Sequence, residues 1–326
     1  RTGDGTTRSR YAGLNVAGKQ RAYKEKIRAT ATLEKVFRAM ELIAASRIAK
    51  ARETAEGNDP YTRVLTEAIA TVAAHSHEES HPLLNERTDT NRVAVLVVTS
   101  DRGMAGAYSA SVLREADRFM EELREEGKEP VLYVAGRRGI SHYHFRGVEV
   151  AQTWSGQSDH PSVELSGQIA DALLERFLAP ADENPVCELH VVFTRFESMV
   201  RQVVQVRHML PMEIVDTDEP IADYSAEPDE LGEYPVPVHA VYEFEPSPQE
   251  IFDQMLPLYV RQRISNVLSM AAASELASRQ QAMHSATENA GQLIEDYTRL
   301  ANNARQSEIT TEITEIVSGA DALKSS

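Results

Sequence analysis

The stretch MHSATENAGQLIEDYTRLANNA, residues 283–304, carries the pattern that decides the fold. Apolar or small residues recur there at steps of three and four: Met283, Ala286, Ala290, Leu293, Tyr297, Leu300 and Ala304. Such steps predict the heptad seam of a left-handed coiled coil. The helical pattern around this seam covers residues 248–320, and before its last turn only Pro257 and Gly291 interrupt it. At about 1.5 Å per residue this helix is on the order of 100 Å long, so we expect it to protrude from any core the chain can build.

A second long helix is predicted near the opposite end of the chain. Residues 19–56 contain neither glycine nor proline, and helical steps connect the apolar residues Leu33, Val36, Phe37, Met40, Ile43, Ala44, Ile48 and Ala51. Asp59 and Pro60 can begin a continuation of this amphipathic helix. We therefore expect segments 19–76 and 248–320 to wind together as a long antiparallel coiled coil.

Residues 91–247 are predicted to form a globular α/β domain inserted between the two helices. Short β-branched runs predict strands at residues 93–98, 131–135, 189–194 and 203–208, and helical patterns alternate with them. This alternation favours a largely parallel, Rossmann-like sheet. Residues 213–240 are rich in proline and acidic side chains, so we expect a solvated loop there, with no role that the sequence assigns.

The charge of the chain is unevenly distributed. The formal net charge is -16, which argues against a general nucleic-acid binder because phosphate affinity depends on Lys and Arg. Residues 19–52 are nevertheless basic, and residues 209–260 contain no Lys or Arg. The basic helix is compatible with a solvated face, with nucleic acid, or with an acidic protein surface.

Motifs for catalysis, nucleotides or metals are weak. The loop TSDRGMAGAY, residues 99–108, follows a predicted strand but lacks the spacing of phosphate-binding loops, so we interpret it as a structural turn. His75, His77 and His81, and likewise His142 and His144, are interpreted as solvated histidines, and no cofactor or metal is expected. Cys187 is the one cysteine and is interpreted as a core residue. No apolar run is long enough to cross a membrane.

Several segments resemble one family. They are RAMELIAASRI at 38–48, TSDRG at 99–103, ASELASRQ at 273–280, SATENAGQLI at 285–294, ARQSEI at 304–309 and ITTEITEIVSGADA at 309–322. In this order they resemble the gamma subunits of bacterial F-type ATP synthases, and their sequences are most similar to those of actinobacterial members. The resemblance implies a non-catalytic central rotor stalk that couples proton flow through the membrane c-ring to ATP synthesis at the catalytic beta subunits.

The resemblance also implies partners and contact residues. The partners would be the ring of alpha and beta subunits, the epsilon subunit and the c-ring, with no nucleic acid. Location at the cytoplasmic face of the cell membrane would come only through the complex. Met40 would face an acidic loop of beta, among the cations Lys35, Arg38 and Arg47. Arg305 and Gln306 would contact another beta loop, and Ile313, Ile316 and Val317 would form the apolar tip of the shaft. Phe37 departs from the family, in which Thr is common at this position.

Two alternative functions remain open, and the first residues of the chain need a separate interpretation. A coiled-coil adaptor for an acidic partner outside a rotary complex is the main alternative, and a Rossmann-type enzyme is another. Residues 1–18 are expected to be a disordered or non-native extension. The segment VAGKQRAYK, residues 16–24, resembles the opening of actinobacterial members with Val16 in place of Met, which leads us to expect that the natural protein starts at residue 16.

Overall fold

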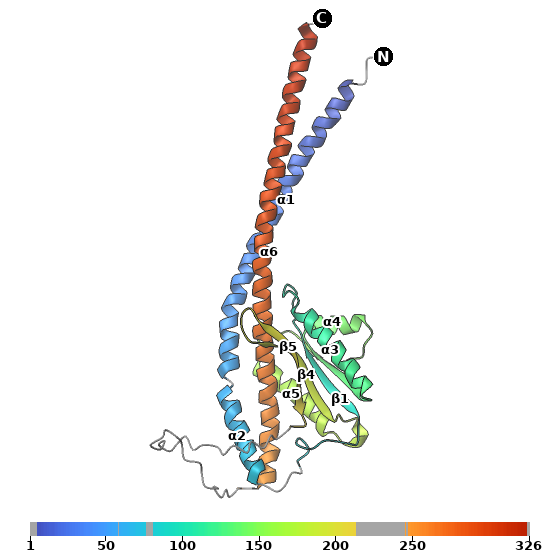
Figure 1. Ribbon diagram of the computed structural model, residues 1–326, viewed down its shortest axis with the longest axis vertical. Coiled ribbons are helices and arrows are strands. Elements are labelled where there is room, and N and C mark those ends of the chain that lie inside the picture. Colours follow the sequence, from blue (N-terminus) through green and yellow to red (C-terminus); the bar gives the residue numbers. More distant parts are fainter. Residues whose placement is uncertain (1–4, 58, 76–80, 213–244, 246, 325–326) are drawn as a thin grey trace, which may run out of the picture. The chain divides into compact units, whose positions relative to one another are not determined.

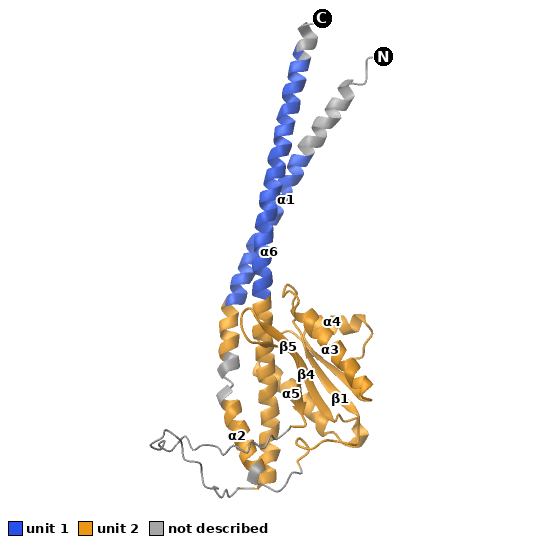
Figure 2. Ribbon diagram, in the orientation of Figure 1, with its two compact units in different colours: residues 1–45, 279–326 blue, residues 46–278 orange. Residues whose placement is uncertain are grey.

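The computed structural model describes residues 5–57, 59–75, 81–212, 245 and 247–324 (Figure 1). The predicted acidic loop 213–240 and His77 lie outside these residues. The chain divides into two compact units, which we describe separately (Figure 2). The α/β unit comprises residues 46–278, and the helical pair comprises residues 1–45 and 279–326.

The α/β unit is built on a five-stranded sheet with the strand order β3-β2-β1-β4-β5. Its strands are β1 (Arg92–Val98), β2 (Glu129–Ala135), β3 (Gln152–Trp154), β4 (Glu188–Phe196) and β5 (Gln202–Leu210). Strands β1 to β4 are parallel to one another, whereas β5 pairs antiparallel with β4. The predicted α/β fold with a largely parallel sheet is therefore confirmed, with the short strand β3 added at one edge.

Helices cover both faces of this sheet. They are α2 (Asp59–His75), α3 (Tyr108–Glu125), α4 (Arg137–Phe145), α5 (Val163–Leu178) and the first part of α6 (Pro248–Lys324). The short 3-10 helix η1 (Ala181–Glu183) has no buried residue. Alternate residues of β1 belong to two different cores because successive strand side chains point to opposite faces. Leu96 packs in the core that contains α2, α5 and α6, and Val95 packs in the core that contains α3.

The helical pair consists of the first part of α1 (Gly5–Gly57) and the last part of α6. Helix α1 thus begins before the predicted Lys19. The rings of Tyr23 and Tyr297 stack with their centroids 6.3 Å apart, and Glu41 Oε1 lies 3.0 Å from His284 Nδ1. Residue numbers rise along α1 as they fall along α6 between these contacts, so the two helices are antiparallel. This confirms the predicted pairing of the terminal helices.

The seam between the paired helices differs from the predicted one at two positions. Met283 and Ala290 are buried, and Ala286, Tyr297 and Ala304 are half-buried. Leu293 and Leu300, however, are 45% and 39% exposed, whereas Ala301 is only 7% exposed and Ile294 is half-buried. The seam therefore passes through Ile294 and Ala301. Neighbouring residues are rotated by about 100° around a helix, and the small Ala301 allows close approach of the partner helix.

No helix among the described residues combines the length and the apolar character that crossing a membrane requires.

Candidate interaction site on the helical pair

Helix α1 exposes a line of apolar side chains beside its buried seam. We call Leu33, Val36, Met40 and Ile43 the outer stripe; they follow one another at steps of three, four and three. Leu33, Val36 and Ile43 are each about half exposed, and Met40 is half-buried. The residues that follow the last three members are Phe37 and Glu41, which are half-buried, and Ala44, which is buried. Neighbouring residues are about 100° apart around a helix, so the stripe is rotated away from the seam by about that angle.

Helix α6 repeats this arrangement. Leu293 and Leu300 each precede a seam residue, and both remain exposed. Leu42 of α1 adds a further exposed apolar side chain. Apolar side chains exposed in contiguous lines commonly mark a surface that a partner covers. The helical pair therefore carries apolar surface in excess of what its own seam buries.

Cations accompany the outer stripe on α1. Lys35 and Arg38 are exposed and flank Val36 in the sequence. Glu41, the nearest acidic residue on the C-terminal side, points at His284 of the paired helix. An apolar stripe with flanking cations suits a partner surface that combines apolar and acidic groups.

The structure does not group Arg47 with these cations. Arg47 belongs to the α/β unit, where its guanidinium forms an ion pair with the carboxylate of Asp159. The Arg47 side chain is half exposed and that of Asp159 is largely buried. A half-exposed pair of this kind contributes about 1 kcal/mol or less, yet it already engages the predicted contact residue within its own unit.

The exposed face of α6 changes character toward its end. Arg305 and Gln306 are exposed, and a shallow polar groove is lined by Asn303, Gln306, Ser307, Thr310, Thr311, Thr314 and Glu315. The hydroxyls of Thr310, Thr311 and Thr314 donate to carbonyls one turn earlier, at 2.7 to 2.9 Å. This face thus offers amide and guanidinium groups rather than an apolar stripe.

The predicted tip residues are also exposed. Ile316 is 71% exposed, and Ile313 and Val317 are more than half exposed. Three branched apolar side chains within two turns are unfavourable in water, because each could contribute about 1.5–3 kcal/mol if fully buried. Among the residues that the structure describes, none therefore covers these side chains at the end of α6.

The turn at residues 99–103 has a structural role. The carboxylate of Asp101 accepts hydrogen bonds from the backbone N–H groups of Arg137, Gly156 and Ser158 at 2.7 to 3.1 Å. A β-carbon on Gly136, whose φ is +106°, would lie 2.1 Å from the carbonyl oxygen of Thr99. The Asp101 side chain thus connects this turn to the segments that begin α4 and follow β3, which is a structural role.

Sequence reasoning missed one group in the α/β unit. Glu188 and His190 of β4 and His208 of β5 lie together, although His208 is far from the other two in the chain. The signal was available, because Glu188 and His190 are two residues apart on a strand and β5 is the next strand in sequence. The register of the β4–β5 hairpin was needed to place His208 beside them.

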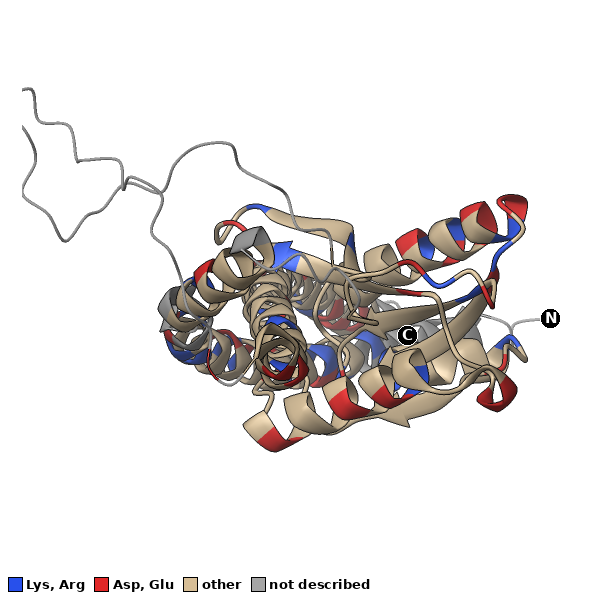
Figure 3. Ribbon diagram, turned by 90° about the horizontal axis from the view of Figure 1, so that it is seen from below, with Lys and Arg blue, Asp and Glu red and all other residues tan. Residues whose placement is uncertain are grey.

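Both charge signs are interspersed over the helices (Figure 3). The charged surface therefore does not by itself single out one docking face, and the combination of the outer stripe, Lys35 and Arg38 on the helical pair is more specific.

Comparison with known proteins places these features in a family. The family model for ATP synthase matches residues 19–323. The ATP synthase gamma chain of Beutenbergia cavernae is 55% identical, with 95% of this chain and 100% of that protein covered. The ATP synthase gamma chain of Bifidobacterium adolescentis is 48% identical, with 94% of this chain and 98% of that protein covered.

Solved structures support the same fold. A chain of the Euglena gracilis mitochondrial ATP synthase, in the OSCP/F1/c-ring structure in rotational state 3, has a TM-score of 0.59 at 16% identity. That match covers 95% of this chain and 96% of the other. A chain of the central stalk and c-ring structure of the Tetrahymena thermophila mitochondrial ATP synthase has a TM-score of 0.52 at 18% identity, covering 77% of this chain and 99% of the other.

Proposed function

The chain belongs to the ATP synthase gamma chain family and is a subunit of the central stalk, and we propose that its helical pair works by contacting the catalytic beta subunits. The outer stripe of α1 would lie against an apolar and acidic surface of beta. Arg305 and Gln306 of α6 would contact a second beta surface, and Ile313, Ile316 and Val317 would turn in an apolar sleeve formed by alpha and beta.

The observation that carries this proposal is the exposed apolar surface of the helical pair. The outer stripe, Leu293, Leu300 and the tip residues are all apolar, and the helical pair leaves most of them exposed. A subunit enclosed by partners would bury these side chains, which gives them a reason to be apolar. The α/β unit would instead contact the epsilon subunit and the c-ring, so association with the cell membrane would come through the complex.

The two faces of the helical pair differ in a way that suits a rotor. The α1 face combines apolar residues with Lys35 and Arg38, whereas the α6 face near Arg305 is polar. Subunits arranged around such a pair would each meet a different surface. Different contacts stabilise different conformations, which is the requirement for driving surrounding subunits through successive states.

We further propose that the chain is itself non-catalytic. The loop most similar in position to a nucleotide-binding turn carries the Asp101 carboxylate, an anion that accepts hydrogen bonds from the backbone N–H groups of Arg137, Gly156 and Ser158. Nothing favours the alternative of a coiled-coil adaptor outside a rotary complex. Calorimetry with the isolated chain should detect no binding of ATP at micromolar concentration, and saturable binding in that range would contradict this part of the proposal.

Site-directed cross-linking of the assembled enzyme tests the contacts. In a Cys187→Ser background, Met40→Cys and Arg305→Cys, each labelled with maleimide-benzophenone and illuminated in the assembled enzyme, should each form a photo-cross-linked product that contains the beta subunit. Ala290→Cys is the matched control, because Ala290 is buried in the seam and should give no product with beta. Cross-links from Met40→Cys and Arg305→Cys to proteins other than alpha and beta would overturn the proposed contacts.

A further inference from the structure

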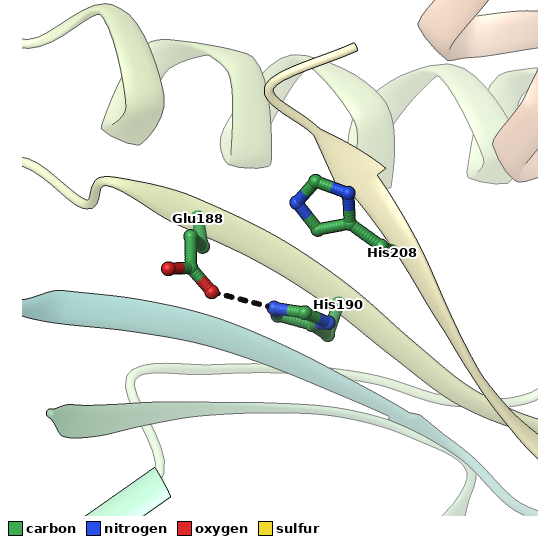
Figure 4. A group of neighbouring side chains, drawn as sticks. All are labelled: Glu188, His190 and His208. Atoms are coloured by element: carbon green, nitrogen blue, oxygen red, sulfur yellow. Dashed lines mark hydrogen bonds and ion pairs between the residues drawn. The ribbon is translucent and has the colours of Figure 1, made fainter. Parts of the chain in front are cut away.

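Three potential metal ligands meet where β4 pairs with β5. Glu188 and His190 are two residues apart on β4, and His208 is the cross-strand partner of His190 (Figure 4). The ladder has an irregularity between Leu189 and His190, which alters the local spacing of the side chains. One ligand atom from each residue lies within 4.8 Å of the ligand atoms of the other two.

Direct contacts hold this group together. Glu188 Oε2 lies 2.9 Å from His190 Nε2, and the imidazole rings of His190 and His208 have their centroids 4.9 Å apart. Lys128 Nζ lies 2.8 Å from the other carboxylate oxygen, Glu188 Oε1. Phe119 of α3 packs against His190 with ring centroids 4.9 Å apart. The carboxylate and His190 are thus oriented by neighbours that are not ligands themselves.

The donor set fits one class of ion. Two imidazoles and a carboxylate are a ligand set of three-ligand zinc sites, in which a fourth position stays open to water. Imidazole nitrogens favour zinc, copper and nickel, whereas magnesium and calcium prefer oxygen ligands. Zinc bonds of about 2.0–2.2 Å need the three ligand atoms to be slightly over 3 Å apart, which side-chain rotation can supply from the observed spacing.

We propose that Glu188, His190 and His208 bind a divalent transition-metal ion, with zinc as the favoured ion, and that this ion links β4 to β5. This revises the expectation from sequence that the protein holds no metal. The proposal is independent of the contacts proposed for the helical pair, because all three ligands lie in the α/β unit.

Other histidines of the described residues make poorer sites. His284 contacts two carboxylates, Glu41 and Glu288, but brings one imidazole. His81 meets Asp253, and His142 meets Asp117, again with one imidazole each. Within the part of the chain that the structure describes, Glu188, His190 and His208 are the group whose three ligand atoms converge.

Lys128 sets the expected strength of binding. Its ammonium group neutralises the Glu188 carboxylate and repels an incoming cation, so the affinity should be lower than that of a site with an unpaired carboxylate. Replacing Lys128 by Gln removes this charge while retaining a hydrogen-bond donor near Glu188. The variant should therefore bind zinc more tightly than the parent chain.

Isothermal titration of the full-length chain with zinc chloride tests the proposal. All variants carry Cys187→Ser, so that the lone thiol cannot contribute a ligand. We expect one zinc ion per chain, with the affinity reduced at least about tenfold by His208→Ala, unchanged by His284→Ala and increased by Lys128→Gln. Magnesium should not compete. Absence of zinc binding by the parent chain, or equal binding by His208→Ala, would overturn the site.

Thermal unfolding gives a second readout that does not depend on titration heats. Zinc should raise the unfolding temperature of the parent chain, because a ligand that binds the folded state stabilises it. The rise should vanish in His208→Gln, which keeps a polar side chain at this accessible position. Far-ultraviolet circular dichroism of each variant without zinc establishes that it is folded. An equal rise in His208→Gln and the parent chain would contradict the proposal.

Discussion

The α/β unit and the helical pair differ in where they place their apolar residues. In the α/β unit, every residue of β1 from Val93 to Val98 is buried, and two cores lie on the two faces of the sheet. In the helical pair, a narrow seam is buried while the outer stripe, Leu293 and Leu300 remain mostly exposed. The first region is stabilised by its own packing. The second leaves apolar surface that no other described residue covers, and we propose that other subunits of the complex cover it.

The largest expected effect is on stability, because a truncated side chain should cost much more in the α/β unit than at the end of the helical pair. Phe177 of α5 is fully buried in the core of the α/β unit, so Phe177→Ala should lower the free energy of unfolding by about 3–5 kcal/mol. The control, Ile316→Ala at the exposed end of α6, should change it by less than about 0.5 kcal/mol. Urea unfolding of the isolated chain measures both. Equal decreases in the free energy of unfolding in the two variants would contradict the difference in packing between the two regions.

A charge placed in the outer stripe should affect coupling more than assembly. Met40→Lys adds a cation beside Lys35 and Arg38, facing the proposed acidic surface of beta. An exposed new ion pair is worth about 1 kcal/mol or less, but a partly desolvated pair exceeds that and would slow rotation. ATP-driven proton pumping by inverted vesicles should fall while the complex still purifies intact. Met40→Leu is the control, and undiminished pumping by Met40→Lys would argue against this contact.

The polar face of α6 should show a smaller effect. Arg305→Ala removes an exposed guanidinium that we propose contacts beta, and it should slow ATP turnover of the assembled enzyme. Arg305→Lys retains the positive charge but lacks the planar guanidinium. If bidentate hydrogen bonds matter, its rate of ATP turnover should therefore lie between those of the parent enzyme and Arg305→Ala. Steady-state hydrolysis rates compare the three enzymes. A wild-type rate in Arg305→Ala would remove Arg305 from the proposed contacts.

The smallest expected effect concerns pH and the α/β unit. His81 was expected from sequence to be solvated, but it is buried. Its Nδ1 accepts a hydrogen bond from the N–H of Leu83, and its Nε2 lies 3.2 Å from Asp253. Burial lowers the pKa of His81 below its usual 6.5, and Asp253 only partly opposes this. The unfolded chain therefore takes up a proton first as pH falls below about 6.5, so the free energy of unfolding should decrease there.

His81→Asn tests this pH dependence. The Asn side-chain oxygen can replace Nδ1 as the acceptor for the N–H of Leu83, but it does not titrate. Urea unfolding at a series of pH values from about 7.5 to about 5 spans the usual pKa of histidine. As the pH falls, the free energy of unfolding should decrease less in this variant than in the parent chain. His144→Asn, at an exposed residue, serves as the control. Identical pH profiles for His81→Asn and the parent chain would exclude His81 as a contributor.

Much of the fold could be predicted from sequence because its elements have strong local patterns. The strands predicted at residues 93–98, 131–135, 189–194 and 203–208 lie within β1, β2, β4 and β5. Strand β3 was missed because three residues, Gln152–Trp154, carry too little pattern to stand out. Its pairing with β2 is a property of the assembled sheet.

The interaction site was less predictable because apolar residues lie on two neighbouring stripes. Leu293 and Ile294 both suit a seam, and only the position of the partner helix decides which is buried. The ion pair of Arg47 with Asp159 joins residues far apart in sequence, so local pattern could not reveal it. The same limit hid the meeting of His190 and His208, which depends on strand register.

Solvent access to the outer stripe tests the central claim most directly. In a Cys187→Ser background, Val36→Cys should react quickly with a water-soluble maleimide in the isolated chain, and much more slowly in the assembled ATP synthase. Ala290→Cys, in the buried seam, should react slowly in both, and labelling is measured by intact mass. The account predicts protection of Val36→Cys on assembly. Equally fast labelling in the isolated chain and in the complex would show that no subunit covers the stripe, and would contradict the account.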